Sequence, residues 1–184
     1  MTGPWGAAPG RDAYLAAERL LDALGAAGQT LATCESLTGG LIGATLTSVP
    51  GASAVYRGGL ITYATALKHV LAGVDPDDLA RDGAVAPGTA RQMAAGARER
   101  CGADWAVAVT GVAGPDEQEG HPAGTVFVAV AGPGTDAVEG LRLSGDRHGV
   151  RAGTVEAALG AVLRAVTTRV PPSTRLDPPG SLNP

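Results

Sequence analysis

The hydrophobic positions of the chain follow two spacings, one typical of amphipathic helices and one typical of buried strands. Helical spacing predicts short helices over residues 66–73 and from Asp75, and further helices over residues 11–27, 39–49, 87–101 and 150–170. Apolar runs bounded by glycine and proline predict strands over residues 30–34, 54–64, 104–111, 123–132 and 137–145. Because strands and helices interleave, we expect a single-domain α/β fold, layered α/β/α, with a central mixed sheet and helices on both faces.

Capping and breaking residues mark where these elements begin and end. Thr38 is a good N-cap for the helix after the first strand, and Gly73 is predicted to end the helix over residues 66–73. We expect one domain over residues 11–169. Residues 170–184 are rich in proline and lack apolar periodicity, which predicts a disordered tail.

Composition and charge exclude several classes of partner. The 184 residues are 45% hydrophobic and 17% charged, as in a globular domain, and the formal net charge of −4 argues against a nucleic-acid partner. No signal peptide or membrane span is predicted, and the cysteines, Cys34 and Cys101, belong to no metal-binding motif. We therefore expect a cytoplasmic protein with no membrane partner, no metal and no cofactor.

The stretch "TCESLTGGLIGATL" passes from a strand into a helix and contains the first candidate residues. Ser36 is a candidate nucleophile. Thr38, Gly39 and Gly40 precede a helix, whose free main-chain N–H groups could bind a phosphate or a developing oxyanion. On these residues alone the other interpretation stays open, in which Ser36 and Thr38 only cap the helix and the glycines only allow a tight turn.

Two further stretches carry candidate chemistry. Lys68 lies among Leu67, Val70 and Leu71, which could desolvate it and lower its pKa enough for it to act as a base; alternatively its ammonium reaches solvent. Tyr63 precedes it and is either a catalytic hydroxyl or a core residue.

The third stretch is a strand ending at Thr110 and Gly111, followed by a long loop. That placement is typical of a binding loop. The loop's acidic residues, Asp116, Glu117 and Glu119, do not have the spacing of a calcium loop, and a solvated charged loop is the favoured interpretation over a metal site.

The combination of these stretches resembles the C-terminal domain of the competence/damage-inducible protein CinA and the stand-alone nicotinamide-nucleotide amidohydrolases. The resemblance covers about residues 11–169 and is carried by residues 34–53, 58–74, 83–115, 122–130 and 145–159. The family motif Glu-Ser-x-Thr-Gly-Gly falls on residues 35–40. A second motif, Thr-Tyr with a lysine five residues after the tyrosine, falls on Thr62, Tyr63 and Lys68. The motif Thr-Gly-x-Ala-Gly-Pro falls on residues 110–115, and Gly-Asp-Arg falls on 145–147.

The resemblance implies hydrolysis of the carboxamide of nicotinamide mononucleotide to nicotinic acid mononucleotide and ammonia, with no cofactor. It implies that Ser36 attacks, that Lys68 serves as base, and that Tyr63 orients the lysine or relays protons. Arg147 is then the candidate phosphate contact. For the oxyanion we expect the main-chain N–H groups of residues 38–40, with the Thr110-Gly111 turn as the second choice. The family also favours a homo-oligomer.

This sequence departs from the family pattern at three places. Leu37 stands where many relatives have cysteine, Ala64–Leu67 replace a polar segment, and Asp116–Glu119 replace a glycine-rich loop, which adds negative charge beside a phosphate site. An alternative function, a non-catalytic ligand-binding or interaction protein, also stays open, because the family name derives from competence and damage responses. Ser36 and Lys68 at family spacing argue against it.

Overall fold

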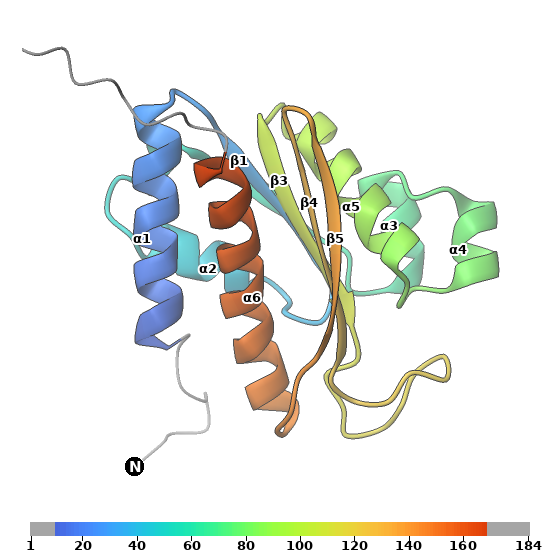
Figure 1. Cartoon of the computed structure of the whole chain (residues 1–184). Coiled ribbons are helices and arrows are strands. Elements are labelled where there is room, and N and C mark those ends of the chain that lie inside the picture. Colours follow the sequence, from blue (N-terminus) through green and yellow to red (C-terminus); the bar gives the residue numbers. More distant parts are fainter. Residues whose placement is uncertain (1–9, 169–184) are drawn as a thin grey trace, which may run out of the picture.

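The sheet at the centre of the molecule has five strands, and its order confirms the predicted mixed α/β architecture. The computed structural model describes residues 10–168 (Figure 1). The strands are β1 (Leu31–Glu35), β2 (Tyr56–Ile61), β3 (Trp105–Gly111), β4 (Thr125–Gly132) and β5 (Thr135–Arg142). They lie in the order β2-β1-β3-β4-β5. β1 is parallel to β2 and β3, whereas β4 is antiparallel to both β3 and β5.

Helices cover both faces of this sheet, which completes the three layers. One face carries α1 (Arg11–Ala26), α2 (Leu41–Thr47) and α6 (Arg147–Thr167). The other carries α3 (Thr65–Ala72) and α5 (Pro87–Arg100), and α4 (Pro76–Asp82) packs against α5. A short 3-10 helix, Ala52–Ala54, precedes β2.

The central strand β3 shows why the two faces differ. Successive side chains of a strand point to opposite faces. Trp105, Val107 and Val109 therefore join the core under α1 and α6, while Ala106 and Ala108 join the core under α5. The small side chains on the second face bring the helices close to the sheet.

Several predicted boundaries are wrong, among them the strand predicted over 54–64, which covers only 56–61, and two of the others have a local reason. Gly40, with φ of 99°, is the N-cap residue of α2, so Thr38 does not cap this helix. The last helix begins at Arg147 because the Asp146 carboxylate accepts a hydrogen bond from the Gly149 N–H at 2.8 Å. The second strand of the hairpin begins at Thr135, two residues before the predicted start.

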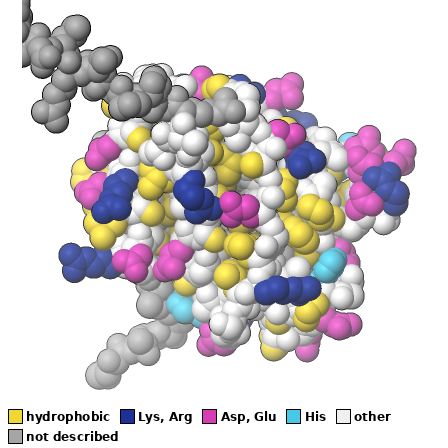
Figure 2. All heavy atoms as spheres, in the orientation of Figure 1, with side chains coloured by type: hydrophobic (Ala, Val, Ile, Leu, Met, Phe, Trp, Pro, Cys, Tyr) yellow, Lys and Arg dark blue, Asp and Glu magenta, His cyan; other side chains and the backbone are white. Residues whose placement is uncertain are grey.

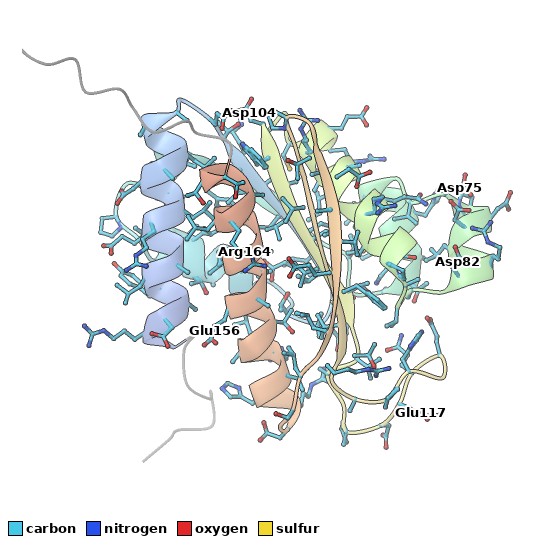
Figure 3. All side chains as sticks on the ribbon, viewed as in Figure 1. Asp75, Asp82, Asp104, Glu117, Glu156 and Arg164 are labelled. Atoms are coloured by element: carbon cyan, nitrogen blue, oxygen red, sulfur yellow. The ribbon has the colours of Figure 1, made fainter. Side chains whose placement is uncertain are left out.

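Parallel pairing places the candidate residues at the carboxyl ends of the strands. At the amino ends, the Asp104 carboxylate accepts hydrogen bonds from the Thr30 N–H and hydroxyl, both at 2.8 Å, which fixes the starts of β1 and β3 (Figure 3). Ser36 follows β1, Tyr63 follows β2, and Thr110 lies near the end of β3. The carboxyl ends of these strands therefore meet where α/β folds bind ligands.

The surface adds little to this picture. Acidic side chains gather at α4, at the right of Figure 2, where Arg81 pairs with Asp78 at 2.6 Å and with Asp82 at 2.8 Å. No helix within residues 10–168 is long and apolar enough to cross a membrane. The predicted tail, 170–184, lies outside the described residues.

Candidate active site

A small pocket of about 120 Å³ opens at the carboxyl ends of β1 and β3. It is lined by Ser36, Leu37, Tyr63, Lys68, Ala84, Val85, Thr110, Gly111, Ala113, Gln118 and Arg147. All three residues predicted as catalytic lie in this lining. Of the predicted substrate-binding residues, Thr110, Gly111 and Arg147 belong to it, whereas residues 38–40 do not.

Ser36 and Lys68 meet at the bottom of the pocket, although 32 residues separate them in sequence. The Lys68 Nζ donates a hydrogen bond to Ser36 Oγ at 3.0 Å and another to the Thr62 carbonyl at 2.9 Å. Lys68 is 1% exposed and Ser36 is 8% exposed. The amine is therefore buried and held by two oxygen acceptors, neither of them a carboxylate.

Burial lowers the pKa of Lys68. Desolvation lowers the pKa of Lys68 below its ordinary value of 10.5, although Coulombic interactions with Cys34 and Glu119 act to raise it. The helix neighbours expected to desolvate it do not all do so, because Val70 is 58% exposed and α3 buries only Lys68 and Ala72. The lysine is instead covered by segments outside its own helix.

Cys34 is the other buried nucleophile near Lys68, and its environment makes it unreactive. Its Sγ lies 3.7 Å from the Thr62 Oγ1. Burial raises the pKa of the Cys34 thiol to about 12, so the thiolate is scarce near neutral pH. Cys34 is also absent from the pocket lining, which leaves Ser36 as the candidate nucleophile.

The Glu35 carboxylate holds the start of α2. It is 1% exposed and accepts hydrogen bonds from the N–H groups of Gly40 and Ile42, at 2.9 and 3.1 Å, and of Gly43, at 2.8 Å. The N–H groups at this helix start, which were expected to be free for a ligand, therefore bind Glu35. The expectation that residues 38–40 supply the oxyanion donors is therefore wrong for Gly40, and Gly39 donates to the Ser36 carbonyl at 3.1 Å.

Arg151 holds the same turn from the opposite side. Its Nε and Nη2 donate to the carbonyls of Leu37 and Thr38, at 3.1 and 2.9 Å. Within residues 10–168, the N–H groups of Leu37 and Thr38 have no hydrogen-bond acceptor. The two amides that follow Ser36 are thus available to a bound oxygen. Thr38 Oγ1, also buried, has no partner among the described side chains and main chain.

Neither the contacts of Glu35 nor those of Arg151 were predicted from the sequence. Glu35 stands inside the motif beside Ser36, and that position was the available signal. Arg151 follows Arg147 by four residues, so both lie on one face of α6, but nothing in the spacing tells which loop that face meets.

The mouth of the pocket is exposed. Tyr63 is 58% exposed, and its hydroxyl accepts a hydrogen bond from Arg147 Nη2 at 2.9 Å rather than contacting Lys68. Arg147 Nη1 donates to the Gly114 carbonyl at 2.9 Å. The Lys68 amine is therefore held by the Thr62 carbonyl and not by Tyr63, whose hydroxyl contacts Arg147.

A second hollow of about 370 Å³ adjoins the pocket and shares three lining residues with it, Ala113, Gln118 and Arg147. Asp116 and Glu117 line its outer part. Glu119 is exposed like them, and its carboxylate also accepts hydrogen bonds from the main-chain N–H groups of Ala84 and Val85.

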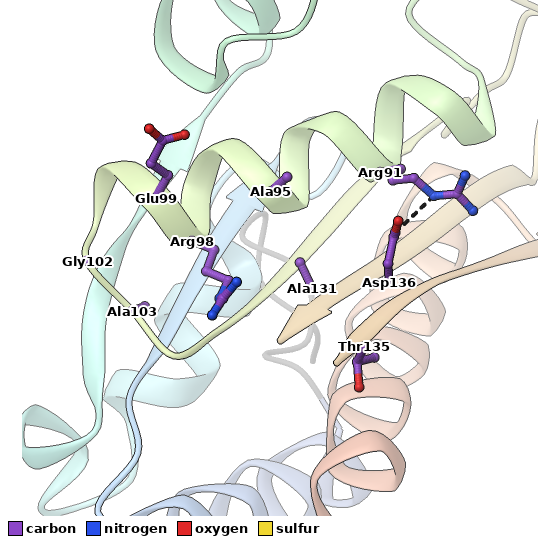
Figure 4. A pocket seen from close by; sticks show the side chains of 9 residues that line it. All are labelled: Arg91, Ala95, Arg98, Glu99, Gly102, Ala103, Ala131, Thr135 and Asp136. Atoms are coloured by element: carbon purple, nitrogen blue, oxygen red, sulfur yellow. Dashed lines mark ion pairs between the residues drawn. The ribbon is translucent and has the colours of Figure 1, made fainter. Parts of the chain in front are cut away.

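Other parts of the described chain offer less chemistry. A hollow of about 620 Å³ lies between α5 and the β4–β5 hairpin, where Arg91 pairs with Asp136 at 2.9 Å and Arg98 donates to the Asp104 carbonyl (Figure 4). Its lining has no nucleophile paired with a base. Within residues 10–168, no group of three or more His, Cys, Asp or Glu side chains could hold a metal ion.

Comparison with known proteins places this site in a family. The model of the CinA C-terminal domain matches residues 14–166. A CinA-like protein of Frankia casuarinae is 50% identical over 135 residues, which are 73% of this chain and 31% of that protein. A putative competence-damage inducible protein of Desulforamulus reducens is 46% identical over 72% of this chain and 32% of that protein. This chain thus spans about a third of the length of these curated relatives.

Solved structures agree. The competence/damage inducible protein CihA from Agrobacterium tumefaciens is 37% identical, with a TM-score of 0.82 over 88% of this chain and 99% of that one. The competence damage-inducible protein A from Klebsiella pneumoniae is 33% identical, with a TM-score of 0.83 over 86% of this chain and 99% of that one. On the sequence and structural matches together, the chain belongs to the family of CinA C-terminal domains.

Proposed function

We propose that this domain is an amidohydrolase that converts nicotinamide mononucleotide to nicotinic acid mononucleotide and ammonia. The observation that carries the proposal is the hydrogen bond of 3.0 Å between Lys68 Nζ and Ser36 Oγ, buried at the bottom of a pocket. A serine hydroxyl is a weak nucleophile until a neighbouring base removes its proton. A lysine whose pKa is lowered by burial can be that base.

The chemical steps follow from these contacts. Neutral Lys68 takes the proton of Ser36 as its oxygen attacks the carboxamide carbon, and it then gives that proton to the departing nitrogen, which leaves as ammonia. Water attacks the resulting ester, its proton passes through Lys68 to Ser36 Oγ, and the carboxylic acid is released. The free N–H groups of Leu37 and Thr38 are the proposed donors to the oxyanion, with the Thr110-Gly111 turn as the alternative.

The shape of the site supports a substrate with a small reacting ring and a larger polar part. The pocket of about 120 Å³ can hold the ring that bears the carboxamide, and the adjoining hollow of about 370 Å³ can hold ribose and phosphate. Arg147 lines both spaces. Its guanidinium has five N–H donors, of which two are used by Gly114 and Tyr63, so donors remain for a phosphate.

A direct assay tests the proposal. The purified full chain is incubated with nicotinamide mononucleotide, free nicotinamide, asparagine or glutamine, and ammonia and the acid product are measured. We expect release from the nucleotide at a far higher rate than from the other three amides. Release from an amino-acid amide alone would change the substrate class, and release from none would favour a non-catalytic binding protein.

A further inference from the structure

The loop over residues 112–124 contains one residue in an unusual conformation. Gln118 and His121 pair through main-chain hydrogen bonds of 3.0 and 2.9 Å, which leaves Glu119 and Gly120 as a two-residue turn. Both turn residues have positive φ, 53° for Glu119 and 74° for Gly120. Glu119 is the non-glycine residue with positive φ within residues 10–168. Asn, Asp or Gly is favoured at this position, so the turn alone does not explain a glutamate.

The side chain of Glu119 supplies the reason. Its Oε2 accepts hydrogen bonds from the N–H groups of Ala84 and Val85, at 2.8 and 3.1 Å, and we call this contact the Glu119 bridge. Ala84 and Val85 belong to the connection between α4 and α5. Gly83 allows the approach, because a Cβ at this position would collide with Glu119 Oε2.

The bridge joins two walls of the candidate pocket. Ala84 and Val85 line it on one side, and Gln118, the neighbour of Glu119, lines it on another. On the far side of the same peptide segment, Thr110 Oγ1 donates to the Ala84 carbonyl at 2.6 Å. The connection before α5 is thus held on both sides. Thr110 binds the Ala84 carbonyl, and Glu119 binds the N–H groups of Ala84 and Val85.

The other acidic residues of the loop make no such contact. Neither Asp116 nor Glu117 forms a hydrogen bond or ion pair through its carboxylate with any of the described residues. Glu117 lies on the outer part of the loop, at the lower right of Figure 3. The bridge is therefore a property of the position of Glu119 and not of the acidic composition of the loop.

We propose that Glu119 is a positioning residue, which fixes the wall formed by Ala84 and Val85 against the loop wall and so shapes the pocket for the reacting ring. The effect of Glu119 on the pocket rests on the proposed function, because its kinetic test requires that the protein turns over nicotinamide mononucleotide. At Glu119 a main-chain conformation that is unfavourable for glutamate coincides with a side-chain contact between two pocket walls, and such strain is common where local geometry serves a site.

Two substitutions separate the bridge from the turn. Glu119→Asn suits the positive φ but is one methylene too short to reach the two amides, so it keeps the turn and removes the bridge. Glu119→Gln keeps an acceptor oxygen of the same reach. Glu99→Gln is the charge-matched control, because Glu99 is exposed on α5 and its carboxylate has no partner among residues 10–168.

The first readout is hydrogen–deuterium exchange of the segment 83–86, which needs no turnover. We expect faster exchange in Glu119→Asn only. The second readout is the kinetics with nicotinamide mononucleotide, where Glu119→Asn should raise KM by roughly tenfold with a smaller change in kcat, since hydrogen bonds to a charged acceptor are lost. Glu119→Gln should restore KM to within about threefold.

The outcomes distinguish the two proposals. Unchanged exchange at 83–86 in Glu119→Asn would overturn the bridge, whether or not the chain is an enzyme. Faster exchange with an unchanged KM would overturn the positioning role and leave Glu119 as a structural contact. A wild-type chain without amidase activity would refute the proposed function, while the exchange result would still decide whether the bridge exists.

Discussion

The floor and the mouth of the candidate pocket are built in opposite ways. At the floor, Ser36, Lys68 and Glu35 are buried, and each is held by hydrogen bonds from different segments. At the mouth, Tyr63 and Arg147 are exposed and hold each other through a single hydrogen bond. The difference teaches that the fold fixes the geometry of the Ser36–Lys68 pair, whereas the exposed pair of Tyr63 and Arg147 is less constrained.

Desolvation explains why Glu35 and Lys68 are paired at the floor. A buried polar group without a partner costs free energy, and within residues 10–168 Thr38 Oγ1 and the N–H groups of Leu37 and Thr38 bear that cost. Glu35 has three main-chain donors and Lys68 has two acceptors. At the mouth, water replaces any lost partner, so a substitution there costs little stability.

The largest effect should come from the nucleophile at the floor. Ser36→Ala removes one hydroxyl from a turn whose main chain is held by Glu35 and Arg151, so the fold should persist. We expect ammonia release to fall by several orders of magnitude, on the order of 10³ or more, because no covalent intermediate can form. The measurement is the single-turnover rate, with the melting temperature as control. A rate within about tenfold of wild type would mean that water attacks directly.

Lys68 should follow closely. Lys68→Arg keeps a cation but removes the base, since a guanidinium does not deprotonate in proteins, so it should be nearly as inactive as Lys68→Ala. In the wild type, the neutral amine forms as pH rises through the pKa. Because burial lowers that pKa, kcat/KM should rise with pH through an apparent pKa below 10.5.

Two results would contradict this view of the floor. Substantial activity in Lys68→Arg would make the lysine an electrostatic anchor. If kcat/KM rises with pH only near the ordinary pKa of 10.5, burial does not lower the pKa of the Lys68 amine.

A smaller effect is expected from the support of the floor. Glu35→Gln replaces one carboxylate oxygen by an NH₂ group that faces main-chain donors. We expect the free energy of unfolding to fall by about 1–3 kcal/mol and kcat to fall by roughly tenfold. Thermal or denaturant unfolding measures the first, and steady-state kinetics the second. Glu156→Gln, on the exposed side of α6 (Figure 3), is the control and should change neither. Equal stability in the two variants would show that the floor tolerates a missing partner.

The smallest effect should lie at the mouth. Arg147→Met should raise KM for nicotinamide mononucleotide by roughly tenfold and leave turnover of a phosphate-free riboside almost unchanged, because one charge-assisted contact is lost. Stability should not change measurably. An equal loss with both substrates would instead assign Arg147 to holding Tyr63 and Gly114 in place.

The elements that were predictable from the sequence depend on short-range patterns. The alternation from Trp105 to Val109 marks a strand buried on both faces, and the glycine at 73 ends its helix with φ of 71°. Parallel strands then bring Ser36 and the helix of Lys68 to one edge. Spacing and handedness of connections carry this information, so it can be read along the chain.

The parts that were missed depend on contacts between distant residues. Thr38 is a good capping residue by type, but the Glu35 carboxylate accepts the hydrogen bonds at the start of this helix. Arg151 binds carbonyls more than a hundred residues away, and Glu119 binds amides about 35 residues away. Helical periodicity shows which side chains share a face, but not what packs against that face. For this reason the expectation that Val70 covers Lys68 is wrong, since Val70 is exposed.

The helix α6 sets a fixed spacing across the site. Arg147 holds the mouth and Arg151 holds the turn after Ser36, and the two are four residues apart on one helix. With a rise of 1.5 Å per residue, about 6 Å of helix separates them along its axis. The spacing of these two arginines is therefore set by the geometry of the helix, and insertions into loop 112–124 would leave it unchanged. A movement of α6 would shift the contacts of Arg147 and Arg151 together.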